Sequence, residues 1–235
     1  METDLVAMHM SDGIVDAPTS LIFGLVAVAG LAVCVAKARG DLDDRTAPLA
    51  GLVAAFVFAV QMLNFPILPG VSGHLLGGAL VAILVGPYVG ALCVAIVLAL
   101  QALLFADGGL SALGTNITNM ALIGTFVGFA VAVALRPLAR RGRTGLLATA
   151  FVAAFLNTVV ASLGFVLEYA IGGQGLALGT VLGLMVGLHA LIGIGEGIIT
   201  ALTVGAVAAV RPDLVYLLRG ERRGLTVRSA QGASS

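Results

Sequence analysis

The stretch NFPILPGVSGHLLGG, residues 64–78, decides how the rest of this otherwise apolar chain is interpreted. It places Pro66 and Pro69 before a run of small residues and a single imidazole, His74. Proline lacks an N–H and fixes φ, so a plain helix is excluded across this stretch. The residues that follow, LLGGALVAILVG, predict a tightly packed helix with His74 at its N-terminal end. A ligand-competent side chain between two membrane spans predicts a functional role for His74, and hydrogen bonding within a turn is the alternative.

The composition is that of an integral membrane protein. Of 235 residues, 60% are hydrophobic and only 10% are charged, whereas a soluble domain carries about 25% charged residues. The 32 glycines suit helices that pack through small faces. No alternation with a period of two is present, which argues against a barrel. Cys34 and Cys93 lie in apolar runs without metal-like spacing and predict core packing.

Apolar runs separated by polar or proline-containing segments predict the spans. A span needs about 20 apolar residues, so most runs fit one crossing, whereas the last is too long for one and too short for two. The runs cover about 18–36, 47–63, 72–86, 88–106, 117–135, 146–167 and 176–210.

The positive charges predict the topology. All 12 Lys and Arg fall within the three segments 37–45, 136–143 and 211–228. The positive-inside rule makes all three cytoplasmic. Run 72–86 must then cross, and 176–188 is expected to be a re-entrant or interfacial helix before a final span at 189–210. The prediction is an all-α bundle of about seven spans, N-terminus outside and C-terminus inside, with a single transmembrane domain at 17–211 and a basic cytoplasmic tail at 212–235.

This topology gathers polar side chains at the outer face, where no Lys or Arg is predicted. An acidic vestibule bearing imidazoles attracts cations. For Asp16 and Asp107, ordinary solvated loops remain an equal alternative. The outer residues are His9, His74, His189, Asp12, Asp16, Asp107, Asn116 and Asn119, with the two asparagines on one helical side.

The N-terminal segment 1–16 has no Lys or Arg and lacks the pattern of a signal peptide. If the chain began at Met8, its α-amine, the His9 main-chain nitrogen and the His9 imidazole would form fused chelate rings, and His74 would add a fourth nitrogen. Such tetragonal nitrogen coordination suits Ni(II) and Cu(II), and imidazole also serves Co(II). Residues 1–7 are then an extension. Either Met8 is the real start, or the extension is removed, or the site lacks one ligand.

Four ordered motifs carry a family resemblance that covers nearly the whole chain from Met8 onward. The chain resembles the substrate-binding membrane component of cobalt/nickel energy-coupling-factor transporters, the CbiM/NikM type. The METDLVA extension and the Met10-Ser11 pair, which replaces an apolar residue and proline, depart from the pattern. The motifs are MHMSDG (8–13), NFPILPGVSGHLLGGAL (64–80), LLFADGGLSALGTNITNM (103–120) and HALIGIGEGIIT (189–200).

The resemblance implies a metal site made by Met8, His9 and His74, with Ni²⁺ or Co²⁺ as the transported substrate. It also implies a transmembrane coupling subunit, ABC ATPase subunits and a small accessory membrane protein as partners in the cell membrane. No G-x-x-x-x-G-K-[ST] phosphate loop is present, so ATP hydrolysis is expected in the partners, and nucleic acid has no predicted role. Metal binding must displace protons from nitrogen, so affinity is expected to fall as pH drops.

Other polar residues are interpreted as supporting groups. Asp12, Asn64, Ser72, Asn116 and Asn119 are candidates to orient the N-terminal segment or the imidazoles, with helix capping and interhelical bonding as the alternative. Glu196 lies within a span that offers no Lys or Arg partner, so it is expected to be protonated or bonded to hydroxyls and amides. His189 and Glu196, seven residues apart, share a helical face and predict a structural network.

Two other functions are compatible with parts of the sequence. Gly70-Val71-Ser72-Gly73 followed by Gly77 matches the GxSGxxxG pattern of rhomboid-type proteases, with His189 as the base for Ser72. Such a short pattern arises readily by chance in a glycine-rich chain. A cation-coupled secondary transporter using Glu196 is the third interpretation, and it requires uptake without an ATPase. The sequence does not separate cobalt from nickel.

Overall fold

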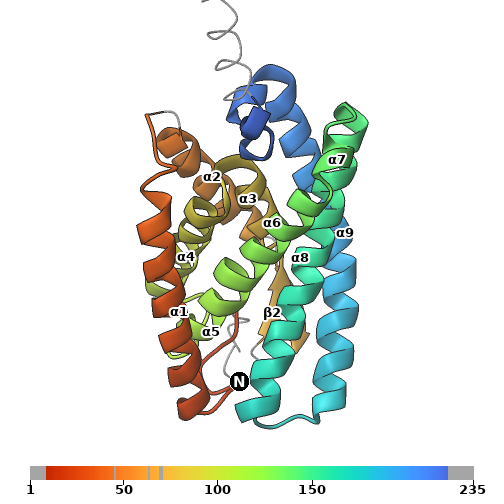
Figure 1. The fold of residues 1–235 in the computed structure, drawn as a ribbon. Coiled ribbons are helices and arrows are strands. Elements are labelled where there is room, and N and C mark those ends of the chain that lie inside the picture. Colours follow the sequence, from red (N-terminus) through yellow and green to blue (C-terminus); the bar gives the residue numbers. More distant parts are fainter. Residues whose placement is uncertain (1–8, 45, 63, 69–70, 222–235) are drawn as a thin grey trace, which may run out of the picture.

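Long apolar helices make up most of the computed structural model, which describes residues 9–44, 46–62, 64–68 and 71–221 (Figure 1). Five helical stretches within these residues are long and apolar enough to cross a membrane, and Thr46–Gln61 is a shorter apolar helix. The expected helical membrane fold is therefore confirmed, while the number of spans and their orientation stay predictions. The helices are α1 (Ala17–Ala38), α2 (Thr46–Gln61), α3 (Gly78–Val85), α4 (Pro87–Leu104), α5 (Leu113–Asn116), the π-helix η1 (Ile117–Gly124), α6 (Thr125–Ala134), α7 (Arg136–Ala139), α8 (Arg143–Gly172) and α9 (Leu178–Val210).

The proline-containing stretch forms a β-hairpin inside this helical protein. Strands β1 (Asn64–Leu68) and β2 (Val71–His74) are antiparallel, with Asn64 opposite His74. The exclusion of a plain helix here is confirmed. The expected position of His74 at a helix N-terminus is wrong, because α3 begins only at Gly78. Gly77 precedes it with φ +80°, a left-handed conformation that stops the helix from extending back to His74.

Helix α3 forms the centre of the bundle. All eight of its residues are buried, and Gly86 separates it from α4, which begins at Pro87. Gly128 of α6 lies so close that a Cβ there would come within 2.7 Å of the Ala79 Cα. A fully apolar helix surrounded by other helices needs no polar face, which is why the run from Gly78 to Val85 shows no amphipathic pattern.

Helix α9 corrects the predicted break at 188. Residues 178–210 form one helix of 33 residues, so a separate re-entrant or interfacial helix over 176–188 is wrong. The stretch contains no proline, and three of its glycines, Gly193, Gly197 and Gly205, face α8. A Cβ at Gly193 would lie 3.1 Å from Phe155, and one at Gly197 would lie 2.6 Å from Phe151. Such close packing through small residues holds long membrane helices together.

The ends of the helices sort into two groups. At the first, which we call the N-terminal end, Asp16 N donates to Gly172 O (2.8 Å) and Gly109 N to Met10 O (3.0 Å). At the other, the C-terminal end, Arg136 Nε donates to Leu217 O (2.9 Å). The described Lys and Arg lie at the end of α1 or just after it, in or around α7, or in the C-terminal segment, all at the C-terminal end (Figure 1). Three basic segments predicted to share one side of the membrane therefore share one end of the bundle.

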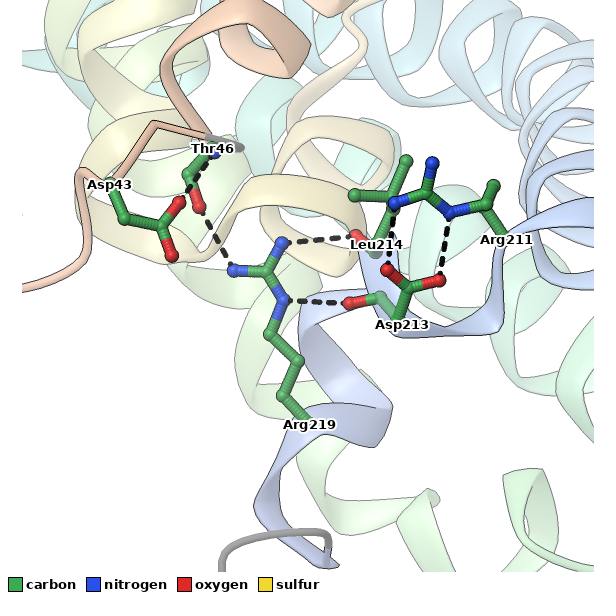
Figure 2. Close-up of polar contacts among 6 residues, drawn as sticks. All are labelled: Asp43, Thr46, Arg211, Asp213, Leu214 and Arg219. Carbon is green, nitrogen blue, oxygen red and sulfur yellow. Dashed lines mark hydrogen bonds and ion pairs between the residues drawn. The ribbon is translucent and has the colours of Figure 1, made fainter.

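The described part of the C-terminal region packs onto this end of the bundle as η2 (Pro212–Leu214) and η3 (Tyr216–Glu221). Val215 and Leu217 are fully buried. Figure 2 shows Arg219 reaching three partners: Nη1 donates to Thr46 Oγ1 (3.0 Å), and the other guanidinium nitrogens donate to the carbonyls of Asp213 and Leu214. Asp43 accepts from Thr46 N at 2.6 Å, so the same contacts cap the start of α2. Arg219 thus joins the C-terminal segment to the α1–α2 connection.

Replacing Arg219 by Ala is expected to lower the free energy of unfolding by about 1–3 kcal/mol, because half-buried charged hydrogen bonds are lost. Arg211→Ala is the matched control, since its ion pair with Asp213 is exposed and worth about 0–1 kcal/mol. Unfolding of both purified variants in detergent, followed by circular dichroism, measures the difference. Equal destabilisation by the two changes would contradict the role assigned to Arg219.

Candidate metal-binding site

A cavity of about 50 Å³ brings together residues that lie far apart in the sequence. All three histidines line it, together with three buried methionines. Imidazole nitrogen and thioether sulfur are both ligands for transition metals. The lining residues are His9, Met10, His74, Leu76, Asn116, Asn119, Met120, Ala161, Ser162, Phe165, Met185 and His189.

His9 and His74 form the closest pair of candidate ligands. Their ring centroids are 4.5 Å apart with the planes tilted by 52°, and the two residues are only 3% and 4% exposed. The structure therefore joins the N-terminal segment to the end of β2, as the predicted site requires. Proximity alone allows both rings to reach one ion.

Hydrogen bonds orient two of the imidazoles. His74 Nδ1 lies 3.0 Å from Leu75 O, and His189 Nδ1 lies 2.8 Å from Met185 O. A carbonyl oxygen only accepts, so Nδ1 carries the proton in both rings and the lone pair is on Nε2. This is the usual way in which a neighbouring carbonyl prepares an imidazole for a metal.

Asp107 holds the third imidazole. His9 Nδ1 lies 3.2 Å from Asp107 Oδ1, and Asp107 is buried at 6% exposure. The solvated-loop alternative for Asp107 is therefore wrong. Gly108, with φ +88°, follows it, and a Cβ there would lie 2.8 Å from the His9 Cβ. A glycine at 108 lets the loop approach His9 this closely.

Asn116 fastens the N-terminal segment by its amide group. Its Oδ1 accepts from Met10 N and its Nδ2 donates to Met10 O, each at 3.2 Å. Asp12 accepts from both the main chain and the hydroxyl of Ser111, and the Ser111 hydroxyl lowers the pKa of Asp12. Asn116 and Asp12 therefore hold the segment that carries His9, while their supporting role in metal binding stays a prediction. Asp16 accepts from Thr19 N and caps α1.

Asn119 has a partner that the sequence did not suggest. Its Nδ2 donates to Glu168 Oε2 at 2.6 Å, and Glu168 is fully buried on α8. The apolar run predicted from the sequence ends at 167, one residue before Glu168. An acidic residue next to the end of an apolar run was the signal that was missed. Asn116 and Asn119 both line the cavity, but Asn116 bonds the Met10 main chain and Asn119 bonds Glu168.

Glu196 is bound as expected by amides and a hydroxyl. Asn157 Nδ2 and Thr158 Oγ1 donate to it from α8, at 2.8 and 2.7 Å. It also accepts from two main-chain N–H groups after β2. Glu196 and His189 lie on the same helix but in different environments. Glu196 contacts the main chain of Leu76 and Gly77, whereas His189 lines the cavity.

The other predicted site residues are Met8, Asn64 and Ser72, whose side chains the structure does not describe. Within residues 9–44, 46–62, 64–68 and 71–221, no three His, Cys, Asp or Glu side chains are grouped to hold a metal ion by themselves. Met8 lies outside the described residues. Asn64 and Ser72 lie in β1 and β2, and the supporting roles of their side chains stay predictions.

A helical membrane bundle with an imidazole-lined cavity is compatible with the class of membrane components that handle transition metals. The chain belongs to the CbiM family, described as the cobalt uptake substrate-specific transmembrane region, which matches residues 9–214. The resemblance inferred from the motifs is confirmed, and the protein is a multi-pass membrane protein.

Relatives and solved structures agree with this membership. A putative fused nickel transport protein NikMN of Archaeoglobus fulgidus is 42% identical over 209 residues, covering 88% of this chain and 68% of the relative. The cobalt transport protein CbiM of Sorangium cellulosum is 29% identical over 235 residues, covering 97% and 100%. The crystal structure of a transition metal transporter matches with a TM-score of 0.79 at 28% identity, covering 86% of this chain and 93% of the other. These proteins are named for metal transport, which favours that interpretation over a protease using Ser72 and His189.

Replacing Asn116 by Leu is expected to weaken Ni²⁺ or Co²⁺ binding by about 10–100-fold, because the Met10 main chain loses both partners and the His9 segment is released. Thr118→Val is the matched control, since Thr118 is buried nearby and donates instead to Phe23 O on α1. Isothermal titration of the purified proteins measures the affinities. Unchanged affinity in the folded Asn116→Leu protein would show that the Asn116–Met10 hydrogen bonds do not support metal binding.

Proposed function

We propose that this chain is the substrate-specific membrane component of an energy-coupling-factor importer for Ni²⁺ or Co²⁺. The single observation that carries the proposal is the convergence of His9, His74 and His189 on one cavity from three distant parts of the chain. The cavity lies within a membrane bundle of a cobalt uptake family, and the relatives named for nickel and cobalt support these two ions as substrates.

The proposed ligand set is the Met8 amine, the His9 main-chain nitrogen and imidazole, and the His74 imidazole. A six-membered chelate through the His9 main chain uses Nδ1, which is the nitrogen 3.2 Å from Asp107 Oδ1. Closing the chelate therefore exchanges the Asp107 contact for the metal. His74 Nε2 carries a lone pair and would complete the set. Asn116 and Asp12 support this geometry by holding the segment from Met10 to Asp12.

The direction of transport is proposed from the distribution of charge. The basic segments occupy the C-terminal end of the bundle, and His9 and Asp107 lie with the N-terminal segment at the other. With the basic end in the cytoplasm, the site would receive its ion from outside. A transmembrane coupling subunit, ABC ATPase subunits and a small accessory membrane protein would then drive its release inward.

Replacing His74 by Ala is expected to reduce Ni²⁺ or Co²⁺ affinity by more than about 100-fold, a larger loss than a supporting residue causes. His189→Ala, an imidazole of the same cavity, is expected to cost less than about 10-fold because it is not one of the four proposed nitrogens. Metal analysis and titration of purified protein measure both, with mass spectrometry defining the N-terminus. A chain retaining residues 1–7 that depends on His74 and His189 but not His9 would contradict the proposed ligands.

Transport is expected to require the partners. Cells expressing this chain with its coupling subunit and ATPases should accumulate radioactive nickel or cobalt, and a catalytically inactive ATPase should abolish accumulation. The chain alone is the control. Accumulation by the chain without any ATPase, lost on Glu196→Gln, would instead identify a cation-coupled secondary transporter.

A further inference from the structure

Between His74 and α3, the N–H groups of Leu76 and Gly77 and the carbonyl of Leu76 have no partner in a strand or helix main chain, whereas the Gly77 carbonyl accepts from Val81 N of α3. β2 ends at His74 and α3 begins at Gly78, so residues 75–77 form a turn within the bundle. Buried main-chain N–H and C=O groups need partners, and inside a membrane protein water does not readily supply them. Side chains from other helices supply them here.

The partners of this turn come from two sides. Leu76 N donates to Glu196 Oε2 at 2.8 Å, and Gly77 N donates to Glu196 Oε1 at 3.0 Å. On the opposite side, Gln61 Nε2 of α2 donates to Leu76 O at 2.8 Å. The Leu75 carbonyl accepts from the His74 ring itself. One carboxylate on α9 therefore holds two of the three N–H groups of this segment, which also carries the carbonyl that orients His74.

Helix α8 in turn fixes the carboxylate. Each Glu196 oxygen has a second donor, Asn157 Nδ2 on Oε1 and Thr158 Oγ1 on Oε2. Gly78 and Gly124 make room for Asn157, because a Cβ at either position would lie 2.8 or 2.7 Å from Asn157 Oδ1. Glu196 is 2% exposed and accepts four hydrogen bonds, two from main chain and two from side chains.

We propose that Glu196 is a positioning residue for the metal site, which sets the place of the His74 imidazole by holding the main chain of Leu76 and Gly77. This inference rests on the proposed function, since it assigns Glu196 a part in the affinity of the same site. Glu196 itself touches no metal: it acts through two N–H groups, the Leu75 carbonyl and the His74 ring. The role differs from that of a general packing residue because it requires a carboxylate, with two acceptor oxygens.

Glu196→Gln tests this requirement while keeping the shape of the side chain. Glutamine replaces one oxygen by an NH₂ group that only donates. In either orientation of the amide, the NH₂ faces one main-chain N–H of the turn, which then loses its acceptor. The turn shifts, the Leu75 carbonyl moves, and the His74 ring loses its orientation.

The experiment measures Ni²⁺ affinity by titration and the visible absorption spectrum of bound Ni²⁺, on proteins shown to be folded by circular dichroism. Glu196→Gln is expected to weaken binding by about 10–100-fold and to change the spectrum, because the ligand geometry changes. Thr158→Val, which removes one donor to the carboxylate, is expected to weaken Ni²⁺ binding less than Glu196→Gln does. Thr158→Ser keeps the hydroxyl and is expected to have wild-type Ni²⁺ affinity and spectrum. Thr149→Val is the matched control on α8, since this buried threonine donates to Leu135 O away from the site.

A double-mutant cycle separates positioning from general stability. If Glu196 acts through His74, then Glu196→Gln adds no further loss of affinity in a His74→Ala background. A folded Glu196→Gln protein with wild-type affinity and spectrum overturns the inference, as does an equal loss in Thr149→Val. If Glu196→Gln does not fold, Thr158→Val decides: affinity equal to that of Thr149→Val overturns the inference. Wild-type protein that binds neither Ni²⁺ nor Co²⁺ refutes the proposed function instead.

Discussion

Non-helical main chain inside a helical membrane bundle must find its hydrogen bonds among side chains, and the site depends on this constraint. The N-terminal segment and the turn after β2 carry the two closest imidazoles, and both are irregular. Asn116 satisfies the Met10 main chain, and Glu196 with Gln61 satisfies Leu76. Buried polar residues on α2, α5 and α9 are therefore explained by the main chain they hold, and Asn157 and Thr158 on α8 by the Glu196 carboxylate they hold.

The same arrangement gives the cavity its chemistry. His74 and His189 each donate from Nδ1 to a carbonyl and leave Nε2 available, while His9 contacts a buried carboxylate. The rings reach the cavity from an N-terminal segment, a hairpin and a long helix. Since each imidazole ring is held by different contacts, a shift in one of these elements changes the distances between the rings.

Part of this site was predictable from residue chemistry. His74 stands out because it follows two prolines in an apolar chain, and the three histidines share one predicted face. Asn116 is predicted to orient the N-terminal segment, and in the structure its amide bonds the Met10 main chain. Glu168 and Gln61 were not predicted, because an acid at the end of an apolar run and an amide at the end of a helix look like ordinary boundary residues. Their partners, Asn119 and Leu76, are distant in sequence.

The sequence by itself determined that the protein is a helical membrane protein, that its basic segments lie together, and that its polar side chains are concentrated near its histidines. These properties follow from hydropathy, charge and short motifs, which can be read from neighbouring residues of the chain. Only the tertiary structure decided that His74 ends a β-strand, that residues 178–210 form one helix, and that Asp107 is buried against His9. Each of these three features depends on contacts with residues that are distant in the sequence. Gly193 and Gly197 are compatible with a helix break in isolation, whereas packing against Phe155 and Phe151 keeps the helix continuous.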